Sequence, residues 1–263
     1  MKVGVDLQAI QGPYGDRGIG FYNESLFKKI IAHKPADMDF IWFMQPYKPV
    51  PAFAAYSGRQ VLMPVAVKPE HYYAEKVSEL KLDILHYTCP FGDSPIPKVN
   101  NIGCSTIATI YDLIPLKLPF YFGTTLNKSD YMSRLQTLKT YQTLLTISDS
   151  VKDDIVHYLS YPAAKIKVIG AGVDEDFFDY SPNSDSAFHR RNLMTQPHMA
   201  QPYILCTGGD DPRKNLSRLI EAFKLLPPRF AHYKLVIVCD LSQSTKSALL
   251  AQAEKAGVQE RLT

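Results

Sequence analysis

The sequence predicts an α/β protein with one complete doubly wound parallel sheet, followed by the start of a second domain of the same kind. Three observations favour this fold class. Short apolar runs alternate with helical patterns, several of these runs are continuously apolar, and glycine-rich stretches lie between strand and helix at two places. Continuous apolar strands are typical of a parallel sheet that helices cover on both faces.

The first domain is predicted over residues 1–180. Its first strand, Val3–Val5, leads through the glycine-rich loop QGPYGDRGIG into the helical segment FYNESLFKKII. In that helix we expect one apolar face made of Phe21, Leu26, Ile30 and Ile31. Further strands are predicted at 39–44, 84–88, 105–112, 144–148 and 166–170, with helical segments between several of them.

Residues 181–201 are polar and lack strand periodicity, so they are predicted to link two domains. A second series follows over residues 202–263, with strands at 203–207 and 234–240 and helices at 216–226 and 243–257. This stretch is about half of a typical domain of ~100–150 residues. We therefore expect the second domain to be truncated.

The composition excludes several classes of protein. A net charge of +3, with 29 basic residues scattered along the chain, gives no basic stripe of the kind that binds nucleic acid. The four cysteines are far apart and have no histidine at zinc-ligand spacing, so we expect free thiols and no metal site. No apolar run approaches the ~20 residues of a membrane span, and a cytoplasmic location is expected.

The stretch TGGDDPRKN, residues 207–215, stands where a strand turns into a helix. Gly208 and Gly209 let the backbone approach a ligand closely, and the unpaired N–H groups of a helix start favour anions. Arg213 and Lys214 add positive charge there, which suits a diphosphate. The alternative is a capped turn, with Asp210 or Asp211 as the cap and the two basic side chains in solvent.

Several segments resemble, in order along the chain, motifs of the family-four glycosyltransferases, which have the GT-B fold. They are GDRGIGFYNESL, TIYDLIPL, LLTISDSVKDDI, IKVIGAGVDEDFF and ILCTGGDDPRKNLSRLIEAFKLLP. The resemblance implies transfer of a sugar from a UDP- or GDP-linked donor to an acceptor, with retention at the anomeric carbon. It implies no cofactor and no essential metal, and it places the acceptor in the first domain and the donor in the second.

The resemblance also implies roles for single residues of the first glycine loop. Gly18 and Gly20 match glycines that approach the donor phosphates, although either could be a turn glycine. Arg17 beside them would bind acceptor or phosphate, or would lie in solvent.

Asp112 is expected at the carboxyl edge of the sheet, where it would orient or partly deprotonate an acceptor hydroxyl, or else cap the turn that follows. Tyr111 stands where many relatives have His, and a phenol is a poor base near neutral pH. His86 is a weaker candidate base, and we interpret it as a strand-end histidine whose hydrogen bonds are satisfied.

Ser148 matches a family segment near the acceptor, next to Asp149 or Ser150 as the expected helix cap. Asp174 is expected to be structural. Family members carry a glutamate pair later in the second half, which this sequence does not reach. For that reason we expect weak donor binding by this chain as it stands.

The resemblance and the residues leave three hypotheses open. The chain is a retaining glycosyltransferase of glycan or glycolipid synthesis, a non-catalytic sugar or nucleotide-binding module, or an interaction protein that dimerises through an exposed sheet edge. A lipid-linked acceptor would bring it to the inner face of the membrane, through the basic helix FYNESLFKKIIAHK and the aromatic loop LPFYFG. The alternative for both segments is packing against the core, which we favour.

Overall fold

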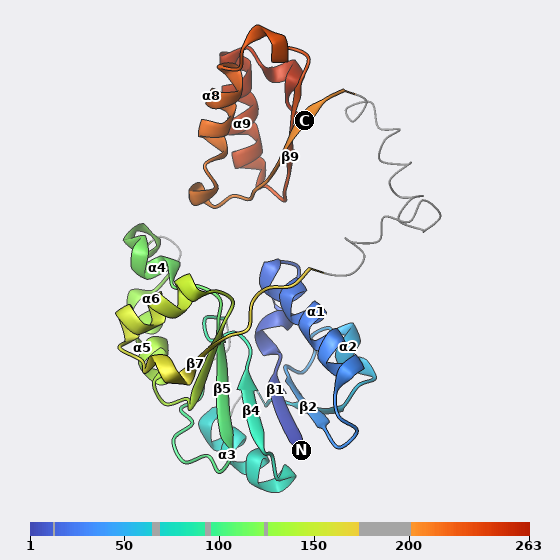
Figure 1. Ribbon diagram of the computed structural model, residues 1–263, viewed down its shortest axis with the longest axis vertical. Coiled ribbons are helices and arrows are strands. Elements are labelled where there is room, and N and C mark those ends of the chain that lie inside the picture. The colour runs from blue at the N-terminus through green and yellow to red at the C-terminus, as the bar shows by residue number, and fades with distance from the viewer. Residues whose placement is uncertain (13, 65–68, 93–95, 124–125, 174–200) are drawn as a thin grey trace. The chain divides into compact units, whose positions relative to one another are not determined.

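The computed structural model describes residues 1–12, 14–64, 69–92, 96–123, 126–173 and 201–263 (Figure 1). The chain divides into two compact units, Met1–Asp174 and Glu175–Thr263. Most of the predicted linker, 181–201, and the residue Asp174 lie outside the described residues. The predicted domain boundaries therefore stay a prediction.

Within the described part of the first unit, seven parallel strands form one sheet in the order β3-β2-β1-β4-β5-β6-β7. The strands are β1 Lys2–Asp6, β2 Asp39–Met44, β3 Arg59–Leu62, β4 Ile84–Tyr87, β5 Ser105–Ile110, β6 Thr143–Thr146 and β7 Ile166–Val168. The order reverses between β1 and β4, which is the switch point of a doubly wound fold. The predicted α/β fold class is confirmed.

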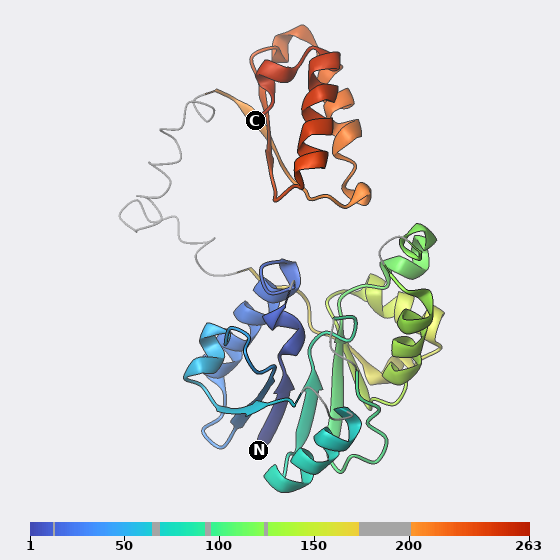
Figure 2. The same cartoon turned by 180° about the vertical axis from the view of Figure 1, so that it is seen from behind.

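Helices connect these strands and cover the sheet (Figure 1 and Figure 2). They are α1 Gly18–His33, α2 Ala52–Ala55, α3 Pro69–Leu80, α4 Ile114–Lys117, α5 Lys128–Leu138 and α6 Asp149–Leu159. The longest, α1, has 16 residues. In the part of the chain that the structure describes, no helix combines the length and apolar character needed to cross a bilayer.

Alternation along the strands produces two apolar clusters. Trp42 and Met44 of β2 pack in one cluster with residues of α1 and α2. Phe43 of β2 and Tyr87 of β4 pack in the other, with α3 and α5. Successive side chains of a strand point to opposite faces, so a strand that is apolar on both faces supplies both clusters.

The apolar face predicted for α1 is wrong at its first residue. Phe21 is 61% exposed, whereas Phe27, which the sequence reasoning left out, is 2% exposed and stacks on Phe53 of α2 at 5.6 Å between ring centroids. The buried stripe runs through Asn23, Phe27 and the half-buried Ile30. This spacing places one polar side chain, Asn23, on the face that covers the sheet.

The sequence reasoning also missed β3. Its residues, RQVL, include only one buried side chain, Val61, because β3 is the edge strand and pairs only with β2 among the described strands. An edge strand with polar residues carries no apolar run to identify it. Three other strands end two residues earlier than predicted: β5 at Ile110, β6 at Thr146 and β7 at Val168.

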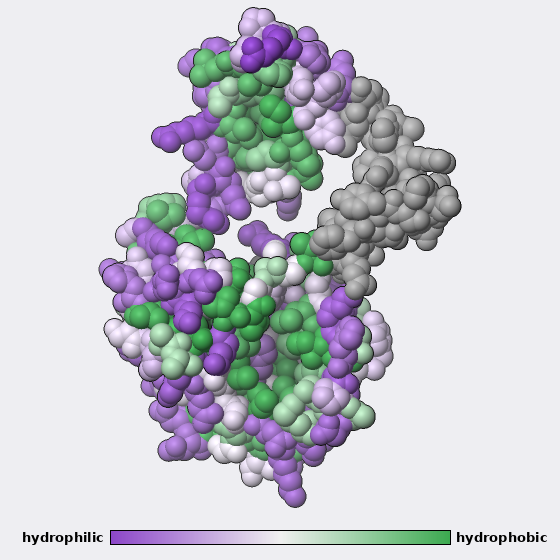
Figure 3. Space-filling model, in the orientation of Figure 1, coloured by the Kyte–Doolittle hydropathy of each residue, from purple (hydrophilic) through white to green (hydrophobic). Residues whose placement is uncertain are grey.

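In the described part of the second unit, β8 Tyr203–Thr207 and β9 Lys234–Val238 form a parallel pair. Helices α8 Leu216–Lys224 and α9 Gln243–Ala256 connect and cover it, with Ile220 and Leu235 fully buried between them. Leu262 pairs with Leu235 of β9 as an isolated parallel bridge. Hydrophobic side chains remain on the surface of this unit (Figure 3), and Leu205 and Val238 are 55% and 57% exposed.

Truncating the two phenylalanines of α1 distinguishes the observed face from the predicted one. Phe27→Ala leaves a cavity among aromatic rings, and we expect it to lower the free energy of unfolding by about 3–5 kcal/mol. Phe21→Ala removes an exposed ring and should change that free energy by about 0.5 kcal/mol or less. Urea unfolding followed by circular dichroism measures both, and equal losses would contradict the orientation of α1.

Candidate functional site

The loops that follow β1, β4, β5 and β6 leave the sheet at the same edge, because these strands are parallel. Ligands of open α/β sheets bind outside the carboxyl ends of the strands, at the switch point. The sequence candidates of the first unit lie in these loops or at the helix starts that follow them. This edge is therefore the candidate site of the first unit.

Tyr111, directly after β5, contacts the first helix. Its hydroxyl accepts a hydrogen bond from Nδ2 of Asn23 at 2.8 Å, and its ring lies edge-on to Tyr22 at 5.5 Å. Tyr22 in turn donates to the carbonyl oxygen of Gly170 at 3.0 Å. Burial raises the pKa of Tyr111 well above the usual value, so the phenol stays neutral and braces the β5 loop against α1.

Asp112 is exposed, and its Oδ1 accepts a hydrogen bond from the backbone N–H of Ile114 at 3.0 Å. The carboxylate thus caps the turn into α4, which was the alternative to a ligand role. Burial, with the Asp112 charge as a smaller contribution, raises the pKa of Tyr131, whose hydroxyl is buried without a hydrogen-bond partner among the described residues. Capping uses one oxygen of Asp112, and an acceptor hydroxyl could bind to the other.

The two glycines of the first loop differ in what surrounds them. A Cβ on Gly20 would lie 1.8 Å from the carbonyl oxygen of Gly15, so Gly20 is required for α1 to pack on its own loop. A Cβ on Gly18 would meet no atom within 4 Å. Gly18 and the neighbouring Arg17 are exposed, and they are the parts of this loop that a ligand can reach.

Ser148 caps α6, and the predicted cap at Asp149 or Ser150 is wrong. The Ser148 Oγ accepts from the backbone N–H of Val151 at 3.3 Å. Asp149 and Ser150 are already in the helix, because β6 ends at Thr146 and the helix begins sooner than the apolar run suggests. Ser148 is half-buried, so capping leaves part of its side chain accessible at this edge.

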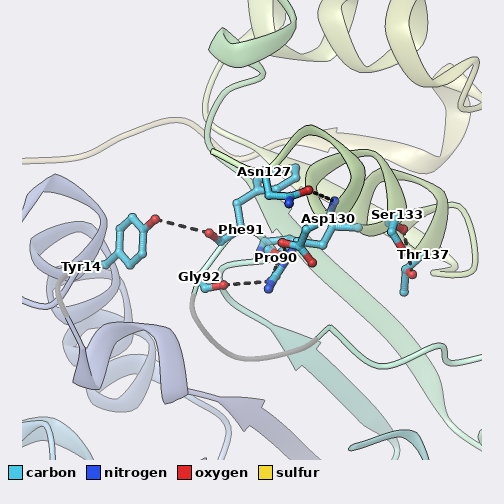
Figure 4. Close-up of polar contacts among 9 residues, drawn as sticks. Tyr14, Pro90, Phe91, Gly92, Asn127, Asp130, Ser133 and Thr137 are labelled. Carbon is cyan, nitrogen blue, oxygen red and sulfur yellow. Dashed lines mark hydrogen bonds and ion pairs between the residues drawn. The ribbon is translucent and has the colours of Figure 1, made fainter. Parts of the chain in front are cut away.

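The loop after β4 is held by Arg134 of α5, which the sequence reasoning did not single out. Figure 4 labels Pro90 and Gly92, the loop residues that Arg134 contacts. Nη1 of Arg134 donates to the carbonyl oxygens of Pro90 at 3.0 Å and Gly92 at 2.8 Å. Its Nε donates to Asp130 one turn earlier on α5, at 2.8 Å. The fixed fork of a guanidinium suits such a contact with several oxygens at once.

The same loop also contacts the first glycine loop. The Tyr14 hydroxyl donates to the carbonyl oxygen of Phe91 at 3.3 Å, and Figure 4 shows this bond joining the two loops. The Phe91 ring stacks on Tyr131 at 4.7 Å. A Cβ on Gly92 would lie 2.6 Å from the Cβ of Ala9, so the loops are in close contact. Together these contacts hold the loop after β4 in place between the first glycine loop and α5.

Asp6, the last residue of β1, is the buried carboxylate at the switch point. It accepts hydrogen bonds from Nε2 of Gln8 at 2.7 Å and from the hydroxyl of Tyr73 on α3. Thr88 donates to the Asp6 carbonyl oxygen at 2.7 Å, which ties β4 to β1. Burial raises the pKa of Asp6 to about 6, against the lowering by the Gln8 and Tyr73 hydrogen bonds.

His86 is the satisfied strand histidine that the sequence reasoning favoured. It is buried in β4, and its Nε2 lies 2.8 Å from Oγ1 of Thr109 on β5. Burial lowers its pKa to about 4, so the imidazole is neutral at pH 7. The imidazole binds a proton less tightly in the folded state than in the unfolded chain. The stability that neutral His86 contributes is therefore fully present above its usual pKa of 6.5, and it is lost as pH falls toward 4.

In the second unit, the two glycines after β8 serve different needs. A Cβ on Gly208 would lie 2.9 Å from a methyl group of Leu216, so this glycine lets α8 pack against the strand end. Gly209 has φ +156° and open space where a Cβ would be. The backbone at Gly209 is therefore strained for other residues and accessible to a ligand.

Arg213 and Lys214 lie before α8, as predicted, and they form a separate 3₁₀ turn, Pro212–Lys214. Asp211 caps this turn by accepting from the Arg213 N–H at 2.9 Å, and its Oδ2 lies 3.3 Å from Nη2 of Arg213. Both basic residues are exposed. Asn215 holds the loop by its backbone, with φ 54°, and its side chain does not cap α8.

Asp210 joins this loop to the loop after β9. Its two carboxylate oxygens accept from the backbone N–H of Ser242 at 2.9 and 3.1 Å, and Ser242 caps α9 by accepting from the Thr245 N–H at 3.3 Å. The sequence reasoning considered Asp210 only as a local cap. A bond across 32 residues has no signal in the local pattern.

Comparison with known proteins gives relatives in sequence and in fold. No protein-family model matches the chain. Over 163 residues, 60% of this chain, it is 26% identical to the serotype-specific mannosyltransferase WbdA of Escherichia coli. Over 123 residues it is also 26% identical to the O-antigen chain mannosyltransferase B of Escherichia coli. The match covers 19% of WbdA and 31% of mannosyltransferase B, well under half of either relative.

Among solved structures, the chain is similar to HepE of Anabaena in complex with UDP and glucose, with a TM-score of 0.66 and 14% identity over 100% of this chain and 68% of HepE. It is similar to WaaG, a glycosyltransferase involved in lipopolysaccharide biosynthesis, with a TM-score of 0.64 and 19% identity over 99% of this chain and 69% of WaaG. The predicted likeness to GT-B glycosyltransferases is thereby confirmed for the fold.

Replacing Asp6 with Asn should change how stability depends on pH. Between the usual pKa of 3.8 and the raised value of about 6, the folded protein binds a proton at Asp6 more tightly than the unfolded chain does. As pH falls from 7 to 4, the wild type should therefore gain about 2 kcal/mol of unfolding free energy relative to Asp6→Asn. Urea unfolding at both pH values measures this, and a difference that is constant with pH would contradict it.

Replacing Gly18 or Gly20 of the first loop with alanine distinguishes the glycine that packing requires from the glycine that faces open space. We expect Gly20→Ala to lower the free energy of unfolding by about 1–3 kcal/mol or more, since its Cβ overlaps backbone atoms. Gly18→Ala should leave stability within about 0.5 kcal/mol. Thermal unfolding compares the two, and a Gly18→Ala protein as unstable as Gly20→Ala would overturn the assignment of Gly18 to open space.

Proposed function

We propose that this chain is part of a retaining glycosyltransferase that transfers mannose from a nucleoside diphosphate donor to a growing glycan. The observation that carries the proposal is the sequence similarity to two kinds of mannosyltransferase. The fold of the first unit supports it, since its loops gather at one edge of a sheet of the GT-B type. Retention at the anomeric carbon is what the family resemblance implies.

For the donor, the proposal assigns the diphosphate to the loop after β8. Gly209 leaves its backbone open, and Arg213 and Lys214 supply charge from the adjoining turn. Asp211 holds Nη2 of the Arg213 guanidinium, which carries five N–H donors in all. A diphosphate binds there through charge-assisted hydrogen bonds.

For the acceptor, the proposal assigns the edge of the first unit that carries Asp112. Oδ1 of Asp112 caps the turn into α4, and the other carboxylate oxygen takes the proton from the hydroxyl group of the acceptor sugar. The oxygen of that hydroxyl group then bonds to the anomeric carbon of the donor. Tyr111 fixes the loop that holds Asp112, and Ser148 and Arg17 offer further polar groups at the same edge. Gly18 keeps the first loop open.

In the reaction, the bond between the anomeric carbon and the diphosphate oxygen breaks as positive charge develops on the sugar. The departing diphosphate gains negative charge, which Arg213 and Lys214 stabilise more strongly than they stabilise the bound donor. The nucleotide sugar is a substrate, and the chemistry of these side chains requires no cofactor.

A lipid-linked acceptor fits the aromatic segment after α4. Phe120 is 50% exposed and stacks on Tyr121 at 4.4 Å, whereas Phe122 packs against the core. The segment is thus half packed, as the sequence reasoning favoured, and half available for contact with the membrane surface. The amphipathic helix α1 faces the core.

A non-catalytic interaction module is the second candidate, favoured by the apolar surface of the second unit. Leu205 of β8 and Val238 of β9 are more than half exposed, and among the described residues β8 has β9 as its single neighbouring strand, which leaves its other edge open. A homodimer formed through this sheet would cover them. A concentration-dependent change of molecular mass in analytical ultracentrifugation tests it.

Calorimetric titration with GDP and with UDP tests the donor site. We expect binding at about 1 mM or tighter, weakened at least about tenfold when Arg213 and Lys214 are both changed to Ala. Preference for GDP or UDP identifies the base. The matched control changes Arg218 and Lys224 of α8 to Ala, which removes the same charge from exposed positions of the neighbouring helix.

Two results would count against the donor site. Binding that both double variants weaken equally would show a general charge effect and no site at the β8 loop. An absence of nucleotide binding by the folded protein would leave the interaction module as the better reading of this chain.

A further inference from the structure

A hollow lies at the edge of the first sheet where its strands begin, opposite the edge that carries the candidate acceptor site. It has a volume of about 290 Å³, and its lining includes Lys2 of β1, Asp39 of β2, Arg59 of β3 and Lys34 after α1. The N-terminus marked in Figure 1 lies at this edge. The proposed acceptor site lies at the carboxyl ends of strands of the same sheet, so the two sites are at opposite edges of it.

The charges in this hollow are unequal. Lys2, Lys34 and Arg59 are cationic, and Asp39 is the acidic residue among the lining side chains. Hollows lined mainly by one sign of charge concentrate ions of the other sign. The lining therefore favours an anion.

The cationic groups keep donors for a ligand. Nζ of Lys2 donates to the carbonyl oxygen of Leu80 at 3.0 Å, and Nζ of Lys34 donates to that of Met38 at 2.5 Å. Each ammonium has three N–H donors, and these neutral carbonyls fix the ammonium position without cancelling its charge.

Arg59 brings a guanidinium fork to the same hollow. Glu79 of α3 forms an ion pair with Lys76, which lowers the pKa of the Glu79 carboxyl. The charge of Arg59 lowers that pKa further, as a smaller contribution. Glu79 is not part of the lining, and the fork remains the only planar donor group among the lining side chains.

The wall of the hollow lies close to a buried hydrogen-bond donor, the indole nitrogen of Trp42. A Cβ on Gly58 would lie 2.5 Å from the Phe40 carbonyl oxygen and 2.7 Å from Nε1 of Trp42. Nε1 of Trp42 is buried and has no hydrogen-bond partner among the described residues. Buried donors without a partner are rare, and here one lies directly behind the backbone of a lining residue.

We propose that this hollow is a second binding site, distinct from the transferase site, for a small oxyanion: a phosphate group, either free or carried on a sugar. Its volume is near the lower limit of ligand pockets, which are about 300–1,000 Å³, so it suits a small ligand. Two ammonium groups and one guanidinium surround the anion. The site does not depend on the proposed transferase function.

The experiment is an NMR titration of ¹⁵N-labelled protein with inorganic phosphate, at ionic strength held constant with KCl. Trp42 is the single tryptophan of the chain, so its indole N–H gives one assignable resonance. We expect saturable shifts of that resonance and of the Gly58 and Arg59 amides, with a dissociation constant of about 1 mM or lower. A second arm uses glucose 1-phosphate, and shifts of the same resonances would place a sugar phosphate in the site.

The variant that tests the charges is Lys34→Gln with Arg59→Gln, which should weaken phosphate binding at least about tenfold. Lys29→Gln with Lys48→Gln removes equal charge from exposed positions outside the lining and should leave binding unchanged. If the first variant does not fold, Arg59→Gln alone serves, since Arg59 is exposed on the edge strand. Shifts that do not saturate, that map to other residues, or that both variants reduce equally would overturn the proposal.

Discussion

The parallel direction of all strands in the first sheet is the constraint on which the rest of the unit depends. It sends most of the connecting loops from the carboxyl edge into a helix that returns over the sheet, and the reversal of order between β1 and β4 separates those loops. The candidate residues of the first unit come together for this reason. Tyr111 after β5 can reach Asn23 of α1 only because both lie at that edge.

The fold of the first unit buries several polar groups. Protonation of two of them, Asp6 and His86, changes the free energy of unfolding in opposite directions. The Asp6 carboxylate is buried at the switch point and favours its protonated form, whereas the His86 imidazole on the neighbouring strand favours its neutral form. Acid therefore stabilises the fold through Asp6 and destabilises it through His86. Hydrogen bonds from Gln8 and Tyr73 offset part of the cost of burying the charged Asp6 carboxylate. They also hold the start of the first loop in place.

The two edges of the sheet offer different chemistry. At the carboxyl edge, the accessible groups are an aspartate, a serine, one arginine and open glycine backbone, which suit the hydroxyl groups of a sugar. At the amino edge, two lysines and an arginine meet in one hollow, which suits an anion. For the transferase that we propose, whose donor carries phosphate, both edges would be of use, because each discriminates by charge as well as by shape.

The sequence by itself determined the fold class, six of the seven strands of the first sheet, and the family resemblance, because continuous apolar runs and glycine turns are local signals. It also identified His86 as a satisfied strand residue. Tertiary structure decided what local patterns do not encode. Phe27 and not Phe21 faces the core, Ser148 and not Asp149 caps α6, and Arg213 pairs with Asp211 in a turn of its own. The bonds of Arg134, Asp6 and Asp210 connect residues far apart in sequence, and a side chain acquires such a partner only when the folded chain brings the two together.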